Sequence, residues 1–510
     1  MDRRKFLKAY GSLPLAAAVP GLGFGKSAPE SAFRYWGLHP FLEAHPDAVF
    51  IRRTQVPSKD DAEAKKKESE SLARMIFTLK KDSGIDLSHK VAFKPNLTST
   101  KGTGLTHAIC TDPYMNEGII EGLKKLSIKP EQIYVREGLG REQPVTGFTD
   151  MARRTGVHYG DDQDRAPTTV ECPSGVVFRR TKYLGPFAYD DSHLINISKL
   201  KTHSMGLTLC VKNLQGTNIN PYIRFCGGLL KSIADDFQPD AQAHVDELFA
   251  RHQKAGLPRW DTEKAAWMEM WIQRTIDHYA LIKPKTVLHM IEGIYSQNGD
   301  GFDGGPGSDG TPDKFLTNLV IFGRDAFAVD IIGHWIGGHE PGNFGLFHIG
   351  RERGVSTALD PRNVPVYFWE DSGPRLARLE EIPRTPMSTI YLPRADEPRF
   401  HMISEPFRYP AENRVACLSG GSRPNLRDLG PAYASPGCPA SVLELSLPRE
   451  GSARVEVLDR HGDRLFLQEF PHLSQGIHMI QWNTARLSPG KALGRLSVAG
   501  AQVPAPLQLG

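Results

Sequence analysis

The sequence predicts an α/β domain, with a mostly parallel sheet flanked by helices, followed by a small carboxyl-terminal β-sandwich domain. The chain has 510 residues and is 40% hydrophobic, which is enough for two or three domains with buried cores. Before residue 340, short β-rich runs alternate with helical patterns, as is typical of a parallel sheet with helical crossovers. After residue 440, short strands of period two favour a sandwich.

Five β-rich runs form the expected sheet; each is followed by charged or amide side chains, and four of them stop next to a glycine or proline. The runs cover 91–93, 132–135, 193–198, 286–291 and 318–322. Helical patterns lie at 114–126, 240–252, 262–279 and 326–336. Parallel strands end at the same edge of a sheet, so we expect one shared pocket there. Its expected residues are Lys94, Asn96, Glu137, Lys199, Lys201, His203, Lys212, Asn213, Glu292 and Asp325.

The segment 192–216 carries the strongest part of this pattern. Its apolar strand runs directly into Lys199, Lys201 and His203, which alternate and therefore lie on one side of an extended chain. Lys212 follows after a short apolar segment and can lie close to these three side chains. The alternative is a set of solvated lysines on a surface loop, where lysines are common.

Several motifs in this region resemble a known family. They are KPNL at 94–97, the Thr111-Asp112-Pro113 entry to a helix, SKLKTH at 198–203, VKNLQGT at 211–217, and the IEGIYSQNGDGFDGGPGSDG run followed by FGRDAFAVD. Together they resemble the DUF362 family over about residues 45–340. The resemblance implies an α/β domain of a kind often found in exported bacterial proteins. The family is named for its unknown function, so it implies no reaction.

Some relatives attach a ferredoxin-like iron–sulfur segment, and the cysteines argue against one here. The six cysteines stand at 110, 172, 210, 226, 417 and 438, with no CxxC spacing. No ferredoxin-type iron–sulfur motif is therefore present in the sequence. Cys417 and Cys438 could form a disulfide in an oxidising compartment, although spacing alone does not bring their Cα atoms together. Cys110, Cys210 and Cys226 are expected to be buried and unreactive; the alternative is a role as nucleophile or ligand.

The amino terminus resembles a twin-arginine signal. Arg3 and Arg4 precede Phe6-Leu7-Lys8, and the apolar stretch at 12–24 is too short and too rich in glycine and proline to span a membrane. We therefore expect residues 1–28 to be a signal peptide read by the twin-arginine export machinery. The mature protein is expected to be periplasmic or secreted.

The charge distribution bears on the class of partner. Residues 1–28 contain five basic residues and one acidic residue, a net charge equal to the +4 of the whole chain. A mature protein cleaved there is nearly neutral and lacks the basic footprint of nucleic-acid or anionic-membrane binding, so we expect no nucleic-acid partner. The alternating charges of 59–81 are expected to form a solvated helix face.

A glycine-rich loop at 296–310 offers oxygen ligands for a divalent metal. Asn298, Asp300, Asp303 and Asp309 stand among six glycines, although the spacing does not fit an EF-hand. The alternative is a flexible lid with solvated aspartates. Glu292 directly follows a buried strand, so it is a candidate metal ligand with Asp300 and Asp303, a candidate general base, or a carboxylate paired with one of the lysines.

Two aspartates and three histidines remain to be assigned after residue 324. Asp325 is expected to cap the helix that it precedes. Asp330 lies on an otherwise apolar helix and needs a partner, so it either braces a lysine of the pocket or works in it. His334, His339 and His348 are spaced too widely for a zinc helix motif and are expected to be structural.

We expect an α/β domain at 45–370, a linker rich in proline and glycine at 371–435 that wraps over it, and an immunoglobulin-like β-sandwich at 440–510. The last domain loosely resembles the FlgD-like or sorting-type carboxyl-terminal domains of secreted bacterial proteins. We expect it to present or anchor the protein, which leaves room for an envelope partner.

The pocket predicts an enzyme that acts on an anionic small molecule, a carboxylate or a phosphate. Lys94, Lys199, Lys201 and Lys212 would bind the anion, and Asn96 with Asn213 would orient it. His203 or Glu292 would move protons, and Lys201, among other cations, could act as a base or form an imine. Redox, isomerisation and hydrolysis stay open. The alternative is a non-catalytic anion-binding protein or a scaffold subunit of an envelope redox complex.

Overall fold

The computed structural model describes two regions of the chain. The described residues are 33–97, 108–138, 144–159, 167–219, 222, 229, 231–301, 304–308, 310–410, 425–430, 440–447, 451–473, 476–483, 490–498 and 501–509. Several expectations lie outside these residues: the signal peptide at 1–28 and the side chains of Cys226, Asp303, Asp309, Cys417 and Cys438.

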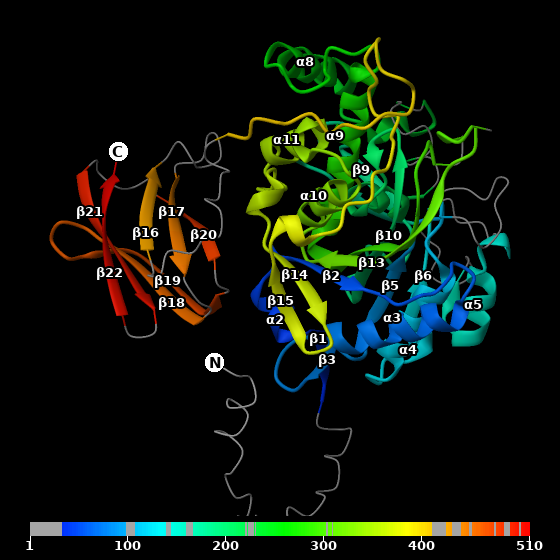
Figure 1. Cartoon of the computed structure of the whole chain (residues 1–510), viewed down its shortest axis with the longest axis horizontal. Helices are drawn as coiled ribbons and strands as arrows, with labels where there is room; N and C mark the ends of the chain where they lie inside the picture. The colour runs from blue at the N-terminus through cyan, green and yellow to red at the C-terminus, as the bar shows by residue number, and fades with distance from the viewer. Residues whose placement is uncertain are drawn as a thin grey trace, which may run out of the picture.

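A large mixed sheet forms the centre of the first region (Figure 1). Its strands, in spatial order, are β15 (Gly373–Ala377), β14 (Val366–Glu370), β2 (Val49–Arg53), β13 (Lys314–Gly323), β12 (Thr286–Gln297), β10 (Ser192–His203), β5 (Lys90–Lys94), β6 (Ile133–Val135) and β7 (His158–Tyr159), and β11 (Gly206–Leu207) pairs with β10. The strands β14, β2, β12, β10, β5, β6 and β7 run in one direction, while β15, β13 and β11 run against them. The α/β class expected from the alternating patterns is therefore confirmed, with a mixed sheet.

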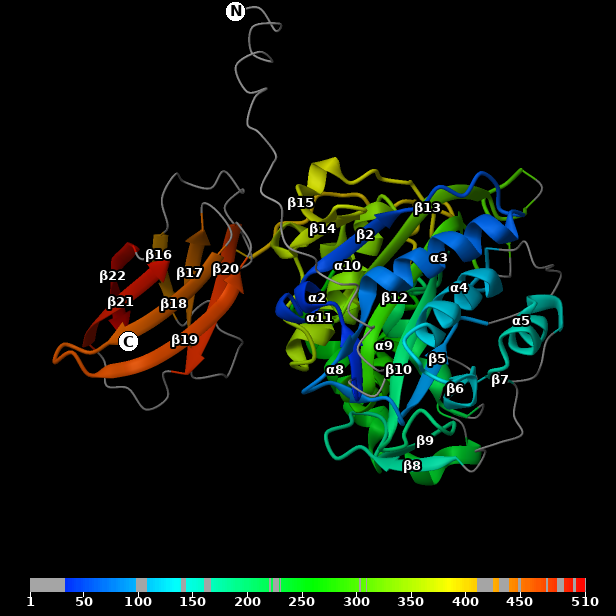
Figure 2. The same cartoon turned by 90° about the horizontal axis from the view of Figure 1, so that it is seen from below.

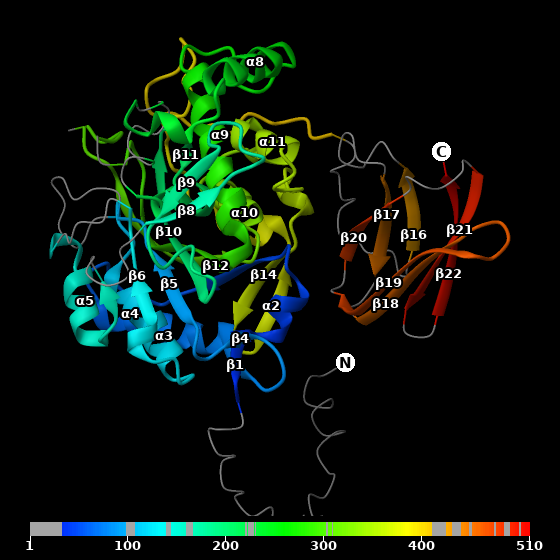
Figure 3. The ribbon, with the colours of Figure 1, turned by 180° about the vertical axis from the view of Figure 1, so that it is seen from behind.

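Helices cover both faces of this sheet, as Figures 1 and 3 show. The first face carries α2 (Pro40–Ala44), α3 (Ala62–Ile76), α4 (Pro113–Lys124) and α5 (Phe148–Thr155), which share one apolar core. The second face carries α6 (Cys210–Asn213), α9 (Ala265–Ile282), α10 (Ala326–Ile336) and α11 (Gly345–Glu352), with α8 (Ala241–Lys254) packed on α9. Such coverage suits parallel strands, whose side chains are buried on both sides.

The direction of β13 overturns one expectation for the pocket. β13 pairs antiparallel with β12, and Gly323 lies opposite His289 near the start of the shared ladder. The carboxyl end of β13 therefore lies at the opposite edge of the sheet from the ends of β5, β6, β10 and β12. Asp325 is consequently not part of the pocket; it caps α10 by accepting a hydrogen bond from the backbone N–H of Ala328.

Part of the segment expected to be a linker is built into the first domain. β15 extends the central sheet, and Met387, Tyr391 and Ile403 are fully buried in the core of the second face. Arg259 fastens the segment further, because its guanidinium donates to the carboxylates of Glu397 at 2.6 and 2.8 Å and of Glu405 at 2.7 Å. The α/β domain therefore continues to about residue 410.

Two small sheets complete this domain. One consists of β3 (Phe77–Lys80), β1 (Tyr35–Leu38) and β4 (Ile85–Asp86), and the other of β8 (Thr168–Glu171) and β9 (Arg180–Tyr183). Both are antiparallel.

The last region is a two-layer β domain that stands beside the first (Figure 2). One antiparallel sheet consists of β16 (Asn425–Gly430), β17 (Ala440–Leu447) and β20 (Gly476–Asn483), and the other of β19 (Arg464–Leu473), β18 (Gly451–Leu458), β21 (Gly490–Val498) and β22 (Ala501–Leu509). Leu443, Val455 and Leu496 belong to the single apolar core that both sheets share. β19, the fourth strand of this domain, pairs with β18 and does not join the sheet of β16, β17 and β20. This differs from the constant-type immunoglobulin arrangement, in which the fourth strand belongs to the sheet of the first two strands.

We predict that a chain ending at residue 410 folds, whereas a chain ending at residue 370 does not. The longer fragment loses the sandwich, whose described contacts with α2 include ring contacts of His472 with Phe41 and His45. The shorter one also loses Met387, Tyr391 and Ile403, each worth about 2 kcal/mol of burial. Thermal unfolding of both fragments checks this, and aggregation of the 410-residue fragment or cooperative unfolding of the 370-residue fragment would contradict it.

Candidate functional site

The predicted pocket residues gather at a point where the chain leaves two neighbouring strands toward opposite faces. β5 leads to α4 on the first face, and β10 leads through β11 to α6 on the second face. Ligand crevices of open α/β sheets form at such a topological switch point, outside the carboxyl ends of the strands. Lys94 ends β5, and Lys199, Lys201 and His203 end β10.

On the second face, Lys94 forms a buried ion pair with Glu137. The Lys94 Nζ atom lies 2.5 Å from the Glu137 Oε2 atom, and the lysine is 0% exposed. Glu137 also accepts from the backbone N–H groups of Leu97 at 3.1 Å and Gly138 at 2.9 Å. Burial lowers the pKa of Lys94, and the adjacent Glu137 carboxylate opposes that effect.

Gly216, in the VKNLQGT motif, makes room for this pair. A Cβ atom at residue 216 would lie 2.2 Å from the Glu137 Oε1 atom and 2.5 Å from the Lys94 Cε atom. Any larger residue would therefore push the two charged groups apart. This close approach gives a physical reason for glycine at that position.

Two asparagine amides connect the strand ends at the switch point. The Asn213 Oδ1 atom accepts from the Lys94 ammonium at 3.1 Å and from the Asn96 amide at 2.9 Å. The Asn213 amide donates to Asn196 Oδ1 at 2.8 Å, while Asn96 Oδ1 accepts from Lys201 at 2.8 Å. Asn96 and Asn213, which were predicted to orient a bound anion, thus accept hydrogen bonds from Lys201 and Lys94 respectively.

On the first face, Lys199 and Glu292 form a second buried ion pair. They are direct partners across β10 and β12, their Nζ and Oε2 atoms are 2.5 Å apart, and both side chains are 0% exposed. The Lys199 ammonium also lies 3.8 Å from the centre of the Tyr295 ring. Burial lowers the pKa of Lys199 and raises that of Glu292, while each partner's charge opposes the shift of the other. Glu292 therefore matches the expectation of a carboxylate paired with a lysine.

A third buried pair extends this cluster and was missed in the sequence. The Lys65 ammonium on α3 lies 2.5 Å from Asp112 Oδ2, which also accepts from the Tyr295 hydroxyl at 3.2 Å. The backbone N–H of Asp112 in turn donates to Glu292 Oε2 at 3.2 Å. Lys65 was expected on a solvated helix face, but it is 3% exposed. Its spacing of seven and eleven residues from Leu72 and Ile76 could have placed it on the buried stripe.

The described contacts of Lys201 include two with oxygen atoms that carry no net charge. Its ammonium donates to Asn96 Oδ1 at 2.8 Å and to the carbonyl of Ile109 at 2.5 Å. Burial lowers the pKa of Lys201 to about 7, and the charge of Lys212 contributes in the same direction. A lysine with such a pKa is partly neutral near pH 7 and can take up or release a proton there. Its complete burial excludes the alternative of a solvated surface lysine.

Lys212 and His203 lie beside an aromatic pair on α9. The Lys212 ammonium is 5.2 Å from the Trp271 ring, and the His203 ring is 6.1 Å from it. Trp267 contacts Trp271 at 4.8 Å between ring centres and is 40% exposed. The pKa of His203 lies well below its usual value because of burial and the charges of Lys212 and Lys201. His203 is therefore neutral at pH 7 and able to accept a proton only at low pH.

Asp330 has a different role from the one expected. It is buried beneath α6 and accepts from the backbone N–H groups of Cys210 at 2.7 Å and Val211 at 2.9 Å. It thus caps the short helix that carries Lys212 and Asn213, and among the described residues it contacts no lysine side chain. Burial raises the pKa of Asp330 to about 8, an effect that these two hydrogen bonds oppose. The Cys210 thiol has a pKa raised well above its usual value by burial, as expected of an unreactive cysteine.

Of the three residues proposed as metal ligands, Glu292 and Asp300 each contact a cation, and Asp303 lies outside the described residues. Asp300 forms an ion pair with Arg399 at 2.9 Å, and Glu292 is committed to Lys199. Among the residues that the structure describes, no group of three or more His, Cys, Asp or Glu side chains is arranged to hold a metal ion.

Residues outside the predicted set also support the site. The Thr389 hydroxyl donates to the carbonyl of His203 at 2.9 Å and to that of Gly206 at 3.0 Å. The segment 371–410 therefore holds the turn between β10 and β11 in place. The segment was expected to be a linker because its sequence has no periodic pattern.

Comparison with known proteins agrees with the resemblance noted in the sequence. Residues 91–334 match a family described as "Domain of unknown function (DUF362)". The matched range begins in β5 and ends in α10, so it contains both lysine pairs formed with Glu137 and Glu292 and leaves out Lys65. The search of curated proteins gave no significant match. Within the described part of the chain, no helix is long and apolar enough to cross a membrane.

We predict strong coupling between Lys199 and Glu292 in unfolding experiments. Glu292→Gln leaves a buried ammonium and Lys199→Met leaves a buried carboxylate, so each should cost about 3–5 kcal/mol of unfolding free energy. The double variant should cost clearly less than the sum, as measured by urea unfolding.

The Lys90–Asp191 pair is the matched control for this cycle. It has the same 2.5 Å separation, but its side chains are 27% and 45% exposed. Its coupling should not exceed about 1 kcal/mol. Equal coupling energies for the two pairs would show that burial is not the decisive factor.

Proposed function

We propose that this protein is an enzyme that binds the anionic group of a small molecule at the switch point between β5 and β10. The observation that carries the proposal is Lys201, a buried lysine whose pKa of about 7 lies close to neutral pH, held by Asn96 at the carboxyl edge of the sheet. An anion next to Lys201 would stabilise its protonated form. The reaction class stays open.

The three buried ion pairs support two different roles for the lysines of the site. Lys65, Lys94 and Lys199 each contact a carboxylate and stabilise the ends of the strands. In this proposal Lys201 and Lys212 contact the anion, and Lys201 exchanges a proton with the ligand. His203 is a weaker candidate for proton transfer at neutral pH, because its neutral form has a very low proton affinity.

The aromatic pair supports a ligand that carries a ring or another flat apolar part next to its anionic group. Exposure rises from Lys201 at 0% through Lys212 at 8% to Trp267 at 40%. A ligand with its anion toward the lysines would therefore lay its other end against Trp267. Tryptophan is well suited to such contacts, because it presents a large flat surface.

Sulfate and benzenesulfonate are suitable probes, because their charge does not change between pH 5 and 9. We expect calorimetry to show binding of both, tighter for benzenesulfonate. Lys212→Met and Lys201→Met should each weaken binding by about 1.5–3 kcal/mol. Affinity should rise as the pH falls from 9 to 6, since Lys201 gains its proton near pH 7, and this dependence should vanish in Lys201→Met.

Lys285→Met is the matched control, because Lys285 lies just before β12 at the opposite edge of the sheet, where it donates to the carbonyl of Tyr189. Its anion binding should equal that of the unmodified chain. Anion binding that survives both Lys201→Met and Lys212→Met would contradict the proposal. Tight binding with no turnover of any tested substrate would favour the alternative of a non-catalytic anion-binding or scaffold protein.

We also propose that the protein is exported through the twin-arginine pathway and that its sandwich domain contacts an envelope partner. The support is Arg3-Arg4 with the apolar stretch that follows. The double variant Arg3→Lys/Arg4→Lys keeps the charge and should remain inside the cell in fractionation experiments. Lys5→Arg, which leaves the arginine pair intact, should be exported normally; equal export of both variants would argue against this route.

A further inference from the structure

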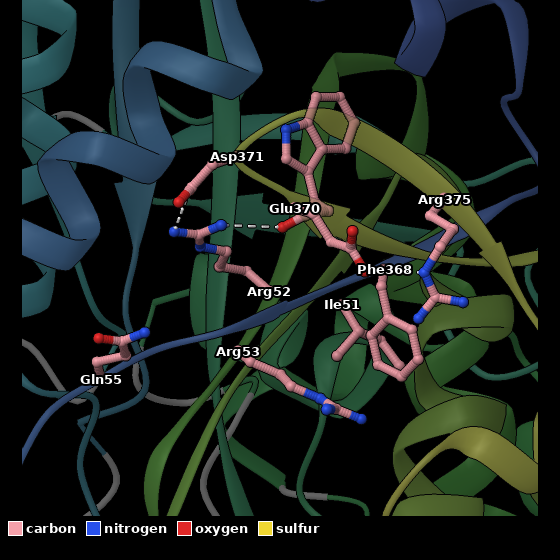
Figure 4. A pocket seen from close by; sticks show the side chains of 9 residues that line it. Ile51, Arg52, Arg53, Gln55, Phe368, Glu370, Asp371 and Arg375 are labelled. Atoms are coloured by element: carbon pink, nitrogen blue, oxygen red, sulfur yellow. Dashed lines mark hydrogen bonds and ion pairs between the residues drawn. The ribbon is translucent and has the colours of Figure 1, made fainter. Parts of the chain in front are cut away.

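A small cavity lies at the carboxyl ends of two parallel strands of the same sheet (Figure 4). Its volume is about 180 Å³, and its lining comes from the ends of β2 and β14 and from β15. β2 and β14 are parallel neighbours; the chain leaves β2 toward α3 on the first face, whereas β14 turns directly into β15, which runs back beside it. The carboxyl ends of parallel strands are the edge at which open α/β sheets bind ligands.

The cavity is separate from the lysine site. The strands β13 and β12 lie between β2 and β10. Neighbouring strands are about 4.8 Å apart, so the two sites are about 14 Å apart along the sheet.

Two of the three arginines around the cavity are held by acidic partners. Arg52 donates to Asp371 at 2.7 Å and to the carbonyl of Trp369 at 3.2 Å. Arg375 donates to Glu370 at 2.8 Å and to Glu381 at 3.1 Å. Both arginines are therefore engaged by acidic side chains in the structure.

Arg53 is bound differently. Its guanidinium lies over the Phe368 ring at 4.4 Å, and it makes no hydrogen bond or ion pair with any residue that the structure describes. A guanidinium on an aromatic face is oriented while its N–H groups stay available for a planar acceptor. Gln55 follows Arg53 by two residues and lines the same cavity. Its side-chain amide makes no hydrogen bond with the described residues. Arg53 and Gln55 therefore offer unused donors at a preformed hollow.

The charges of the lining decide the class of ligand. Arg52 and Arg375 contact the carboxylates of Asp371, Glu370 and Glu381, so Arg53 is the lining cation without an acidic partner among the described residues. A single carboxylate balances its charge and accepts two parallel hydrogen bonds from one guanidinium. A phosphate dianion would add a second negative charge next to two carboxylates. A cavity of about 150 Å³ holds a benzene molecule, so a ligand about the size of benzoate fits here.

We propose that this cavity is a binding site for a small monocarboxylate, held by Arg53 with Gln55. It is a second site, independent of the proposed anion site at Lys201 and Lys212. The ligand carboxylate lies against the Arg53 guanidinium, and its apolar part occupies the hollow between the ends of β2 and β14.

Fluorine NMR with 4-fluorobenzoate tests the site in the full chain. Arg53→Gln should weaken binding by about tenfold or more, as expected for loss of charge-assisted hydrogen bonds. Arg53→Lys should recover part of the affinity, because it keeps the charge and loses the planar pair of donors. Arg53 is exposed, so melting temperatures should be unchanged in both variants.

Two controls separate this site from others. Arg153→Gln removes a 75%-exposed arginine on α5, and Lys212→Met alters the lysine site; neither should change the part of 4-fluorobenzoate binding that depends on Arg53. Benzoate should displace the probe, and inorganic phosphate should do so far less well. The proposal is overturned if 4-fluorobenzoate does not bind, if Arg53→Gln binds it as the unmodified chain does, or if phosphate displaces it as readily as benzoate.

Discussion

The burial of lysine ammonium groups is the constraint on which the rest of this structure depends. Lys94 and Lys199 have no exposed surface, and an ion removed from water costs several kcal/mol unless a partner offsets the loss. Glu137 from the end of β6 and Glu292 from β12 are those partners. The ends of β5, β6, β10 and β12 are therefore tied together by charge as well as by the backbone ladder. A shift of any one strand would leave a charge unpaired in the interior.

In the sequence all the lysines of the site look like anion-binding residues, whereas in the structure some of them form ion pairs with carboxylates. The residues that look like a single cationic pocket include Lys94 and Lys199, which form buried ion pairs, and Lys201, whose described contacts include an amide oxygen and a carbonyl oxygen. Burial lowers the pKa of Lys201 to about 7. The ion pairs Lys94–Glu137 and Lys199–Glu292 fix the strand ends around Lys201. The protonation state of Lys201 itself responds to the charge of neighbouring groups.

The sequence predicted the parts of the fold that local patterns determine. Apolar runs ending in polar residues located β5, β6, β10 and β12, and Asp325 was recognised as a helix cap. The direction of β13 could not be read, because an apolar run has no direction of its own and the connection from β12 decides it. The burial of Met387 and Tyr391 was also hidden, since tertiary contacts place them in a segment without periodicity. Lys65 was missed for the opposite reason: its charge pattern suggested solvent, although its spacing placed it on the buried stripe.

The position of β2 in the central sheet has a consequence for how the chain folds. This strand comes from the start of the described chain, yet its neighbour β14 lies far along the sequence; Arg52 and Trp369, which are hydrogen-bonded, are 317 positions apart. Contacts between such distant residues raise contact order and slow folding, because a long loop must close before they form. A ribosome must release most of this domain before the sheet can be completed. The sheet of the first domain therefore cannot be completed until β14 has been synthesised, and until then β2 presents an unpaired edge.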